Sequence, residues 1–101
     1  MTFRIIYDLV MRIPVGRVTT YKQIALKLGI KDIRIVGYAL NKNPEDPKTI
    51  PCHRVVRSDG SLASGYAFGG ASKQKELLSS EGVKFKKGKV DLRIYLWSKP
   101  K

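Results

Sequence analysis

Two residues able to do nucleophilic chemistry stand side by side in this sequence, and each is the only one of its type. Cys52 is the single cysteine and His53 the single histidine. A thiol is a strong nucleophile only as its thiolate, and its ordinary pKa of about 8.5 falls beside a base or a positive charge. His53 is a candidate base, and Arg54 adds positive charge. Neighbouring side chains of an extended chain point to opposite faces, so this pair needs a turn or a bridging water.

The same residues also allow an inert interpretation. A free cysteine is often buried as a small hydrophobic residue, and structural buried thiols are unreactive. A histidine that merely follows such a cysteine needs no function. Pro51 fixes its own φ and biases Ile50 towards extended backbone, so the chain enters this segment rigidly.

The balance of charge indicates a polyanionic partner. Twenty lysines and arginines face eight aspartates and glutamates, which gives a net charge of +12 over 101 residues. Nucleic acid is the usual partner of so basic a domain. Two alternatives are a basic surface that serves solubility and an anionic membrane surface. No segment combines a basic helical face with a face of large apolar residues, which weakens the membrane alternative.

Length and composition predict one domain, over residues 1–101, in a reducing compartment. The chain suffices for a single modest core, and its one cysteine forms no internal disulfide. Its apolar runs are too short to span a bilayer, and no signal-peptide pattern opens it. One cysteine and one histidine are too few for a metal cluster. We therefore expect a monomer without metal or cofactor, cytoplasmic and nucleoid-associated in a prokaryote, or nuclear in a eukaryote.

Helical patterns dominate the first part of the chain. Apolar residues at helical spacing predict a first helix over residues 2–12. Thr20 and Gln23 have the spacing of a capping box, and they predict a second helix that ends at Gly29. Asp32 is the predicted N-cap of a third helix. These short helices with tight connections are the elements that must position the Cys-His pair.

The third predicted helix, which ends at about Asn41, presents a distinctive face to solvent. Arg34, Gly37, Tyr38 and Asn41 recur on it at i, i+3, i+4 and i+7. Glycine inside a helix costs about 1 kcal/mol relative to alanine, and close approach of another backbone would explain Gly37. Two short helices joined by a tight turn, the second with such a face, are typical of a helix-turn-helix.

The rest of the chain adds a small amount of β-structure. Residues 54–57 and 61–63 flank a Ser-Asp-Gly turn and predict a β-hairpin. Residues 83–97 predict short extended pieces that pack Val90, Leu92, Tyr95 and Trp97 onto the domain. The expected fold is mainly α with a small β-hairpin, a single domain similar to a winged helix-turn-helix.

Two further segments lie between these elements. Tyr66 and Phe68 belong to a glycine-rich loop over residues 65–70, which suits either close approach to a ligand or an ordinary surface loop. A last helix is predicted over residues 72–80, with Glu81 in its final turn. The helix dipole disfavours a carboxylate there, which indicates a partner for Glu81.

Four spaced motifs together resemble one protein family. The first two are Thr20-Tyr21 and the run Arg34-x-Val36-Gly37-x-Ala39-Leu40-x-x-Asn43-Pro44; the others are Pro51-Cys52-His53-Arg54-Val55 and Leu77-Leu78-x-x-Glu81-Gly82. In this order they are similar to the O6-alkylguanine-DNA alkyltransferases over nearly the whole chain. The resemblance implies the active-site and DNA-binding domain of that family, without its usual N-terminal domain.

The resemblance implies a suicide DNA-repair protein. It would bind double-stranded DNA containing O6-alkylguanine, flip the damaged base into a pocket, and move the alkyl group irreversibly to Cys52. By motif position, His53 acts as base through a water, and Glu81 orients and charge-balances His53. Asn43 braces the turn beside the active site, and Tyr21 donates a hydrogen bond to the flipped base. A separate repair protein is a further expected partner.

Two sets of side chains complete the site that the resemblance implies. The expected DNA-binding residues are Thr20, Arg34, Gly37, Tyr38, Asn41 and Lys42, with Arg34 filling the gap left by the flipped base. The expected pocket residues are Tyr21, Leu40, Cys52, Val55, Tyr66 and Phe68. The carbonyls of Cys52 and Val55 would accept hydrogen bonds from the guanine amino group. A lysine common in the family before its Leu-Leu pair is Gln74 here.

A non-catalytic binding module is the nearest rival. Alkyltransferase-like proteins share the fold but carry another residue, often Trp, at the position of Cys52, and they hold alkylated DNA and recruit other repair factors. Retention of Cys52, His53, Asn43 and Glu81 favours transfer. The sequence shows no obvious dimerisation helix for a sequence-specific regulator, and that alternative leaves the Cys-His pair unexplained. A cysteine hydrolase is not expected to be so basic.

Overall fold

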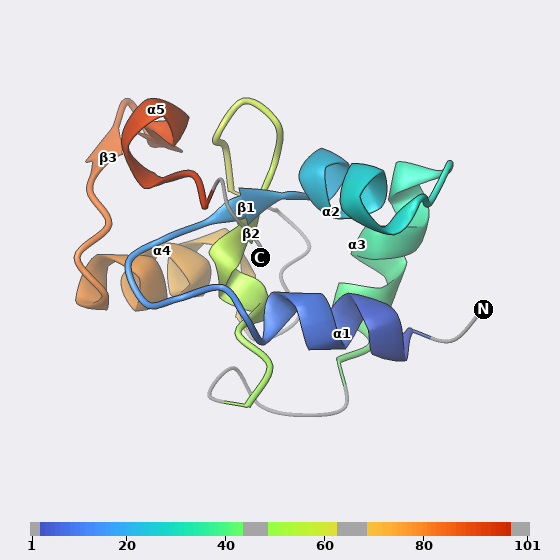
Figure 1. The fold of residues 1–101 in the computed structure, drawn as a ribbon. Coiled ribbons are helices and arrows are strands. Elements are labelled where there is room, and N and C mark those ends of the chain that lie inside the picture. Colours follow the sequence, from blue (N-terminus) through green and yellow to red (C-terminus); the bar gives the residue numbers. More distant parts are fainter. Residues whose placement is uncertain (1–2, 44–48, 63–68, 98–101) are drawn as a thin grey trace.

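Short helices make up most of the fold, and small strand pairs connect them (Figure 1). The computed structural model describes residues 3–43, 49–62 and 69–97. The helices are α1 (Arg4–Val10), α2 (Tyr21–Leu28), α3 (Ile33–Asn41), α4 (Gly70–Ser80) and α5 (Leu92–Tyr95), with a 3₁₀ turn at Cys52–Arg54. The strands are β1 (Thr19–Thr20), β2 (Val55–Val56), β3 (Phe85–Lys86) and β4 (Lys89–Val90). The predicted mainly helical fold is confirmed.

The two helices of the predicted helix-turn-helix begin and end at the predicted residues. Thr20 caps α2 because its hydroxyl accepts a hydrogen bond of 3.0 Å from the backbone N–H of Gln23. The helix ends at Gly29, whose φ of +70° is a left-handed conformation that glycine adopts readily. Asp32 caps α3 by accepting 3.0 Å from the N–H of Arg34. Local side-chain chemistry therefore fixes the connection between the two helices.

One hydrophobic cluster joins the three N-terminal helices to the cysteine turn. Ile6 of α1, Ile24 of α2 and Val36 of α3 are fully buried in it. Cys52 belongs to the same cluster, so packing of the helices fixes the position of the sulfur. Ile33 is exposed, because it is the first residue of α3 and precedes the turns that contact the core.

The hairpin predicted over residues 54–63 forms only at its turn: Arg57 bonds to Ser61 across it, but within the described residues Val55 and Val56 do not pair with the segment that follows the turn. β2 pairs in parallel with β1 instead. The predicted turn is present, since the N–H of Arg57 donates to the carbonyl of Ser61 at 2.9 Å. Ser61 then pairs with Lys89 of β4, and an ion pair of 3.4 Å between Lys89 and Asp59 lies beside this contact. The C-terminal strands thus engage the segment that a local hairpin would have used.

The antiparallel hairpin of the described part is β3–β4, joined at Lys87-Gly88. Val90 packs into a second hydrophobic cluster with α4 and β2, and Leu92 and Tyr95 of α5 pack against that cluster, as predicted. The prediction of extended structure is wrong for Leu92–Tyr95, which forms α5. Asp91 explains the helix, because its carboxylate caps it by accepting 3.0 Å from the N–H of Arg93.

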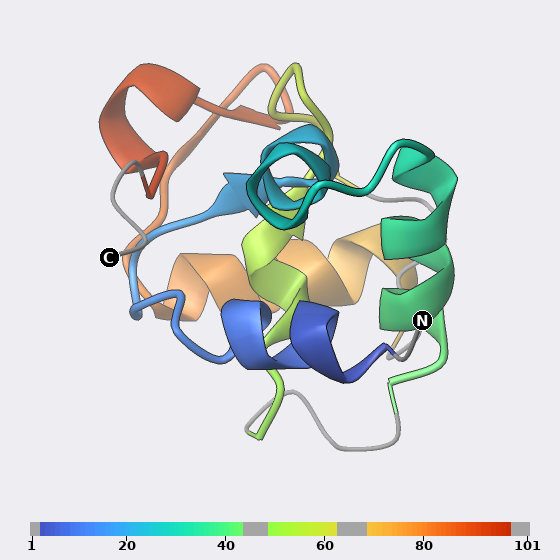
Figure 2. The ribbon, with the colours of Figure 1, turned by 45° about the vertical axis from the view of Figure 1, so that its right-hand side comes forward.

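α4 lies against the 3₁₀ turn and links the two clusters (Figure 2). Leu78 is fully buried in the second cluster, and Leu77 packs against the first. The helix ends at Glu81, followed by Gly82 at a φ of +91°. This end of α4 brings Glu81 towards a turn that lies far from it in sequence.

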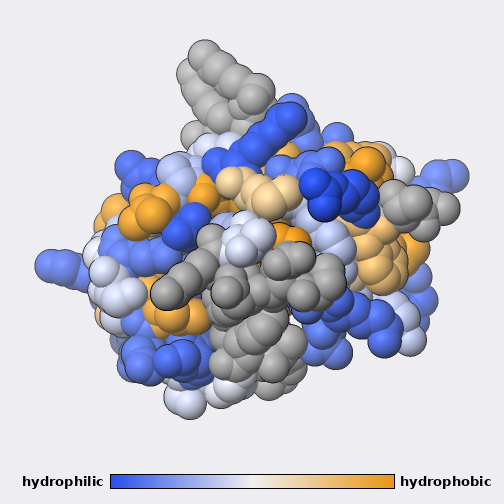
Figure 3. All heavy atoms as spheres, turned by 90° about the horizontal axis from the view of Figure 1, so that it is seen from below, coloured by the Kyte–Doolittle hydropathy of each residue, from blue (hydrophilic) through white to orange (hydrophobic). Residues whose placement is uncertain are grey.

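Hydrophilic side chains are spread over much of the surface seen in Figure 3. Smaller hydrophobic areas lie between them on this face, which is seen from below. Large apolar side chains that stay exposed in the described part include those of Val15, Leu26, Tyr38 and Ile94. None of the helices described is both long and apolar enough to cross a membrane.

Candidate functional site

The cysteine sits on a tight turn rather than on extended chain. The N–H of Cys52 donates to the carbonyl of Ile50 at 2.7 Å, and the N–H of Arg54 donates to that of Pro51 at 3.0 Å. The second of these bonds, together with the bond from the N–H of Val55 to the carbonyl of Cys52, joins residues three apart and forms the 3₁₀ turn Cys52–Arg54. Cys52 and His53 therefore lie on a turn, as their adjacency in the sequence required, and not on an extended chain that would point their side chains to opposite faces. Both side chains are buried.

Asn43 connects the end of α3 to the sulfur. Its side-chain amide donates to the carbonyl of Ile50 at 3.1 Å and lies 3.5 Å from Cys52 Sγ. An N–H donor beside a sulfur favours the thiolate over the thiol, because hydrogen bonding to the charged form stabilises that form. The predicted bracing role of Asn43 therefore has a matching geometry.

His53 pairs with the predicted carboxylate. Its Nε2 lies 2.8 Å from Oε2 of Glu81, and the imidazole is only 3% exposed. An ionised Glu81 can only accept, so Nε2 carries the proton and Nδ1 is left as an acceptor. Nδ1 is buried and has no hydrogen-bond partner among the described residues. The imidazole thus keeps one basic nitrogen available.

Burial and hydrogen bonding together shift the pKa values of His53 and Glu81. Burial lowers the pKa of His53 below its ordinary value, although the hydrogen bond and charge of Glu81 act in the opposite direction. Burial also opposes ionisation of Glu81, but hydrogen bonds from Arg54 and His53 outweigh it and lower the pKa of that carboxyl. The arrangement favours a neutral imidazole beside an ionised carboxylate.

Arg54 is held on the same carboxylate. Its Nε donates to Oε1 of Glu81 at 2.9 Å and its Nη2 to Oε2 at 2.7 Å. Its Nη1 donates to the carbonyl of Ile13 at 2.8 Å. The sequence indicated Arg54 only as a source of positive field, because nothing in its spacing predicts a two-pronged contact with Glu81.

Gln74 supports the turn from α4, and sequence reasoning missed this role. It is fully buried, and its Nε2 donates to the carbonyl of His53 at 3.1 Å and to that of Val55 at 2.9 Å. The Val55 carbonyl is one of those expected to meet the guanine amino group. A carbonyl has two lone pairs, so this contact leaves one for a ligand.

Two phenols have a pKa raised mainly by burial and further by the charge of Cys52. Burial raises the pKa of Tyr21, and the charge of Cys52 raises it further. Burial and then Cys52 likewise raise the pKa of Tyr7, whose hydroxyl donates to the carbonyl of Ala39 at 2.7 Å. Tyr21 was predicted as a site residue. Tyr7 was missed, because a tyrosine on the apolar face of α1 looks like a core residue.

The predicted DNA-binding face of α3 is open. Arg34 points into solvent and forms an ion pair of 3.0 Å with Asp32. A Cβ built on Gly37 meets no atom within 4 Å. Tyr38 is exposed, with Nζ of Lys42 5.4 Å from its ring centroid.

The remaining predicted residues divide by burial. Asn41 is exposed on the same helix, whereas Thr20 is buried and uses its hydroxyl to cap α2. Leu40 and Val55 are buried in the cluster that holds Cys52. Tyr66 and Phe68 lie outside the described residues, so their pocket role stays a prediction.

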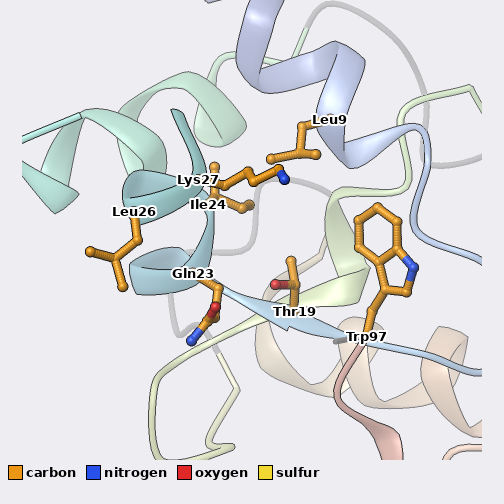
Figure 4. A pocket seen from close by; sticks show the side chains of 7 residues that line it. All are labelled: Leu9, Thr19, Gln23, Ile24, Leu26, Lys27 and Trp97. Atoms are coloured by element: carbon orange, nitrogen blue, oxygen red, sulfur yellow. The ribbon is translucent and has the colours of Figure 1, made fainter. Parts of the chain in front are cut away.

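A pocket of about 350 Å³ lies elsewhere, between α1, α2 and the C-terminal segment (Figure 4). It is lined by Leu9, Thr19, Gln23, Ile24, Leu26, Lys27 and Trp97. None of these residues belongs to the predicted site. Within the described ranges, no cluster of three or more histidine, cysteine or acidic side chains suits a metal ion.

Comparison with known proteins assigns this arrangement to a family. Residues 2–83 match the family described as 6-O-methylguanine DNA methyltransferase, DNA binding domain. The chain belongs to this family. The resemblance drawn from the sequence motifs is thereby confirmed, and with it the assignment to alkylguanine-DNA repair proteins.

The relatives of this chain in the alkylguanine-DNA repair family are longer proteins, and the chain aligns with only part of each. A bifunctional methyltransferase/endonuclease of Picrophilus torridus is 42% identical over 91 residues, which cover 89% of this chain and 30% of that protein. A methylated-DNA–protein-cysteine methyltransferase of Methanothermobacter thermautotrophicus is 46% identical over 80 residues, 79% of this chain and 43% of that protein. The chain therefore spans less than half the length of these relatives.

Solved structures of the family share the fold. The S. pombe Atl1 complex with damaged DNA containing O6-carboxymethylguanine superposes with a TM-score of 0.82 at 33% identity, covering 96% of this chain and 94% of that one. The O6-methylguanine-DNA methyltransferase of Pyrococcus kodakaraensis gives a TM-score of 0.67 at 38% identity, over 79% of this chain and 44% of that one.

Proposed function

We propose that this member of the alkylguanine-DNA repair family transfers an alkyl group from O6-alkylguanine in duplex DNA to Cys52. The observation that carries the proposal is the arrangement around one turn. Cys52 Sγ lies 3.5 Å from the amide of Asn43, and the adjoining His53 pairs with Glu81 at 2.8 Å. Nucleophile, candidate base and orienting carboxylate are thus all present.

The proposed reaction is a displacement at carbon. The Cys52 thiol gives its proton, through a water, to Nδ1 of His53, and the resulting thiolate attacks the alkyl carbon. The new S–C bond forms as the C–O6 bond of the base breaks, with the electron pair passing to the guanine. The imidazolium then returns its proton to solvent. Because the thioether is stable, each molecule acts once.

Tyr21 is the proposed donor to the leaving base. A departing guanine anion needs a hydrogen bond or a proton. Burial and the charge of Cys52 both raise the pKa of Tyr21, so its hydroxyl stays protonated near neutral pH and can donate. The donated proton is replaced from solvent, and the guanine leaves neutral and repaired.

α3 is the proposed DNA-reading element. A base inside a duplex is out of reach, so it must be extruded at a cost of a few kcal/mol. A side chain inserted into the stack offsets part of that cost. Arg34 suits this role, because it is exposed and only a surface ion pair with Asp32, a weak kind of interaction, holds it in the free protein.

A non-catalytic damage sensor is the second candidate function. The likeness to S. pombe Atl1 in complex with damaged DNA, over nearly all of both chains, supports it. Under this alternative the protein binds alkylated DNA and leaves the lesion intact. The two candidates differ in one measurable outcome, the covalent state of Cys52.

The decisive experiment is a transfer assay on a duplex that carries one O6-methylguanine. We expect the peptide containing Cys52 to gain one methyl group by mass spectrometry, in a single turnover. Cys52→Ala should lose transfer but keep DNA binding that weakens with salt. An undamaged duplex of the same sequence is the matched control. Tight binding of the damaged duplex by the native chain without a mass change would instead establish the sensor function.

A further inference from the structure

All three guanidinium nitrogens of Arg54 donate hydrogen bonds, and together they connect it to two separate segments. Two of them contact Glu81, at 2.9 and 2.7 Å, and the third contacts the carbonyl of Ile13 at 2.8 Å. The side chains of Arg54 and Glu81 are only 13% and 15% exposed. Exposed ion pairs contribute little because water screens them, but this pair is largely shielded from water.

Glu81 holds one negative charge between two cationic or potentially cationic partners. Its Oε2 lies 2.8 Å from Nε2 of His53 and 2.7 Å from Nη2 of Arg54. A carboxylate this close to an imidazole favours the imidazolium. An imidazolium donates from both nitrogens and has no acceptor left. Without a second cation, only burial of the ring would oppose the effect of Glu81, which favours protonation of the nitrogen that a base must keep free.

We propose that Arg54 is a positioning residue that neutralises Glu81, so that His53 stays uncharged with Nδ1 as its bare nitrogen. The same two-pronged contact fixes both carboxylate oxygens and hence the orientation of the imidazole. The catalytic value of this arrangement rests on the proposed transfer reaction, in which His53 receives the thiol proton. The electrostatic arrangement itself exists in the free protein.

Among the described residues, Glu81 and Arg54 are the charged groups that act on His53. Glu81 approaches from the end of α4 and Arg54 from the same 3₁₀ turn, while Cys52 is the preceding residue. Gln74 of α4 is an uncharged amide that bonds the backbone of His53. Burial lowers the pKa of His53, Glu81 raises it, and the charge of Arg54 lowers it. The balance among these groups is what a change of Arg54 would disturb.

The test uses the fact that His53 is the single histidine of the chain. An NMR titration of its ring signals reads its pKa and tautomer directly, with no DNA present. In Arg54→Gln we expect the pKa of His53 to rise by about one unit or more. In Arg54→Lys, which keeps the charge but cannot engage both oxygens equally, we expect a smaller rise. Arg93→Gln, which removes the same charge from an exposed ion pair with Asp91, should leave it unchanged.

A second readout separates this role from a merely structural one. In methyl transfer, the acid limb of the pH–rate profile should move to higher pH in Arg54→Gln, with Arg54→Lys recovering part of the native profile. An unchanged or lower pKa of His53 in either folded variant overturns the proposal, even if transfer falls. Should Arg54→Gln fail to fold, Arg54→Lys decides alone. If the variants show the expected pKa shifts of His53 but the native chain never methylates Cys52, the proposed function is refuted and the role of Arg54 still stands.

Discussion

At the scale of single residues, the turn that carries Cys52 depends on polar groups buried around it. Asn43 bonds the backbone before the turn, Gln74 bonds it within and after, and Arg54 ties it to a distant carbonyl. A buried polar group stabilises a fold only when its hydrogen-bonding partners are present, and it destabilises the fold when they are removed. The reactive geometry is therefore maintained by side chains that need no contact with a substrate.

Gln74 gives the most direct test of this dependence. Gln74→Met keeps a similar volume but removes the donor to the carbonyls of His53 and Val55. Leaving buried acceptors unpaired costs about 1–3 kcal/mol, and we expect a loss of that size in the free energy of unfolding by urea denaturation. Gln23→Met is the control: this exposed position on α2 contributes only its backbone N–H to the cap by Thr20, which methionine keeps, so stability should change little. Equal stability of the two variants would contradict a structural role for Gln74.

The His53–Glu81 pair predicts that acid destabilises the fold. Burial lowers the pKa of His53 in the folded state, so the unfolded chain takes up a proton first as pH falls below about 6.5. Although burial opposes it, hydrogen bonding from Arg54 and His53 lowers the pKa of Glu81. The contribution of Glu81 to the free energy of unfolding is therefore present at neutral pH and lost as pH falls through and below about 4.5.

Both effects have the same sign. We expect the free energy of unfolding, measured by denaturant titration at a series of pH values, to decline from about pH 6.5 downwards and to decline further below about pH 4.5. His53→Gln should remove the upper part of this decline and keep the lower part. A native curve that stays flat down to pH 5 would be inconsistent with a buried, neutral His53.

At the scale of elements, α3 combines a weak helix-forming residue with an open surface. Gly37 lies inside the helix, and a Cβ there meets no atom within 4 Å. Gly37→Ala should therefore raise the free energy of unfolding by about 0.5–1 kcal/mol. It should also weaken DNA binding, because the added methyl group stands on the face proposed to approach the duplex.

Gly29 supplies the matched control for this prediction. It too has no atom within 4 Å of an added Cβ, but its φ is +70°. Gly29→Ala should destabilise the fold, since alanine is strained in that conformation. Urea denaturation and fluorescence anisotropy with a labelled duplex measure both quantities. The idea that Gly37 serves DNA approach fails if Gly37→Ala binds DNA as tightly as the native chain.

Local patterns predicted much of this fold, and long-range contacts account for the remainder. The caps Thr20 and Asp32 and the stop at Gly29 depend on neighbouring residues, so they were predictable. The pairing of β2 with β1, and of Ser61 with Lys89, depends on segments far apart in sequence. No spacing rule reveals such contacts, and a local hairpin was predicted in their place.

The candidate site follows the same division. The resemblance paired Glu81 with His53, and these two side chains lie 2.8 Å apart, because motif order carries spatial information that single residues lack. The contacts of Arg54 with Glu81, and the hydrogen bond of Tyr7 to the carbonyl of Ala39, arise from packing between segments that are distant in sequence. Physical reading of one sequence has no access to those side-chain directions.

At the scale of the whole molecule, basic residues lie in two separate regions, at α3 and at the β3–β4 hairpin. Figure 1 places α3 on one side of the molecule and the β3–β4 hairpin and α4 on the other, with the 3₁₀ turn Cys52–Arg54 near the centre. Exposed basic residues occur in both regions, Lys42 beside α3 and Lys86 in β3 among them. A net charge of +12 alone does not decide which region contacts DNA.

The salt dependence of DNA binding distinguishes the two regions. Each phosphate neutralised by a lysine contributes about 0.9 to the slope of log K against log salt concentration. If α3 is the DNA-binding element, Lys42→Ala should reduce the slope by about one, whereas Lys86→Ala, which removes the same charge in the other region, should leave it unchanged. Anisotropy titrations of an undamaged duplex across a salt series measure both slopes. A loss of slope in Lys86→Ala equal to that in Lys42→Ala would instead extend the DNA-binding surface over the C-terminal hairpin, because counterion release reports phosphate contacts wherever they lie.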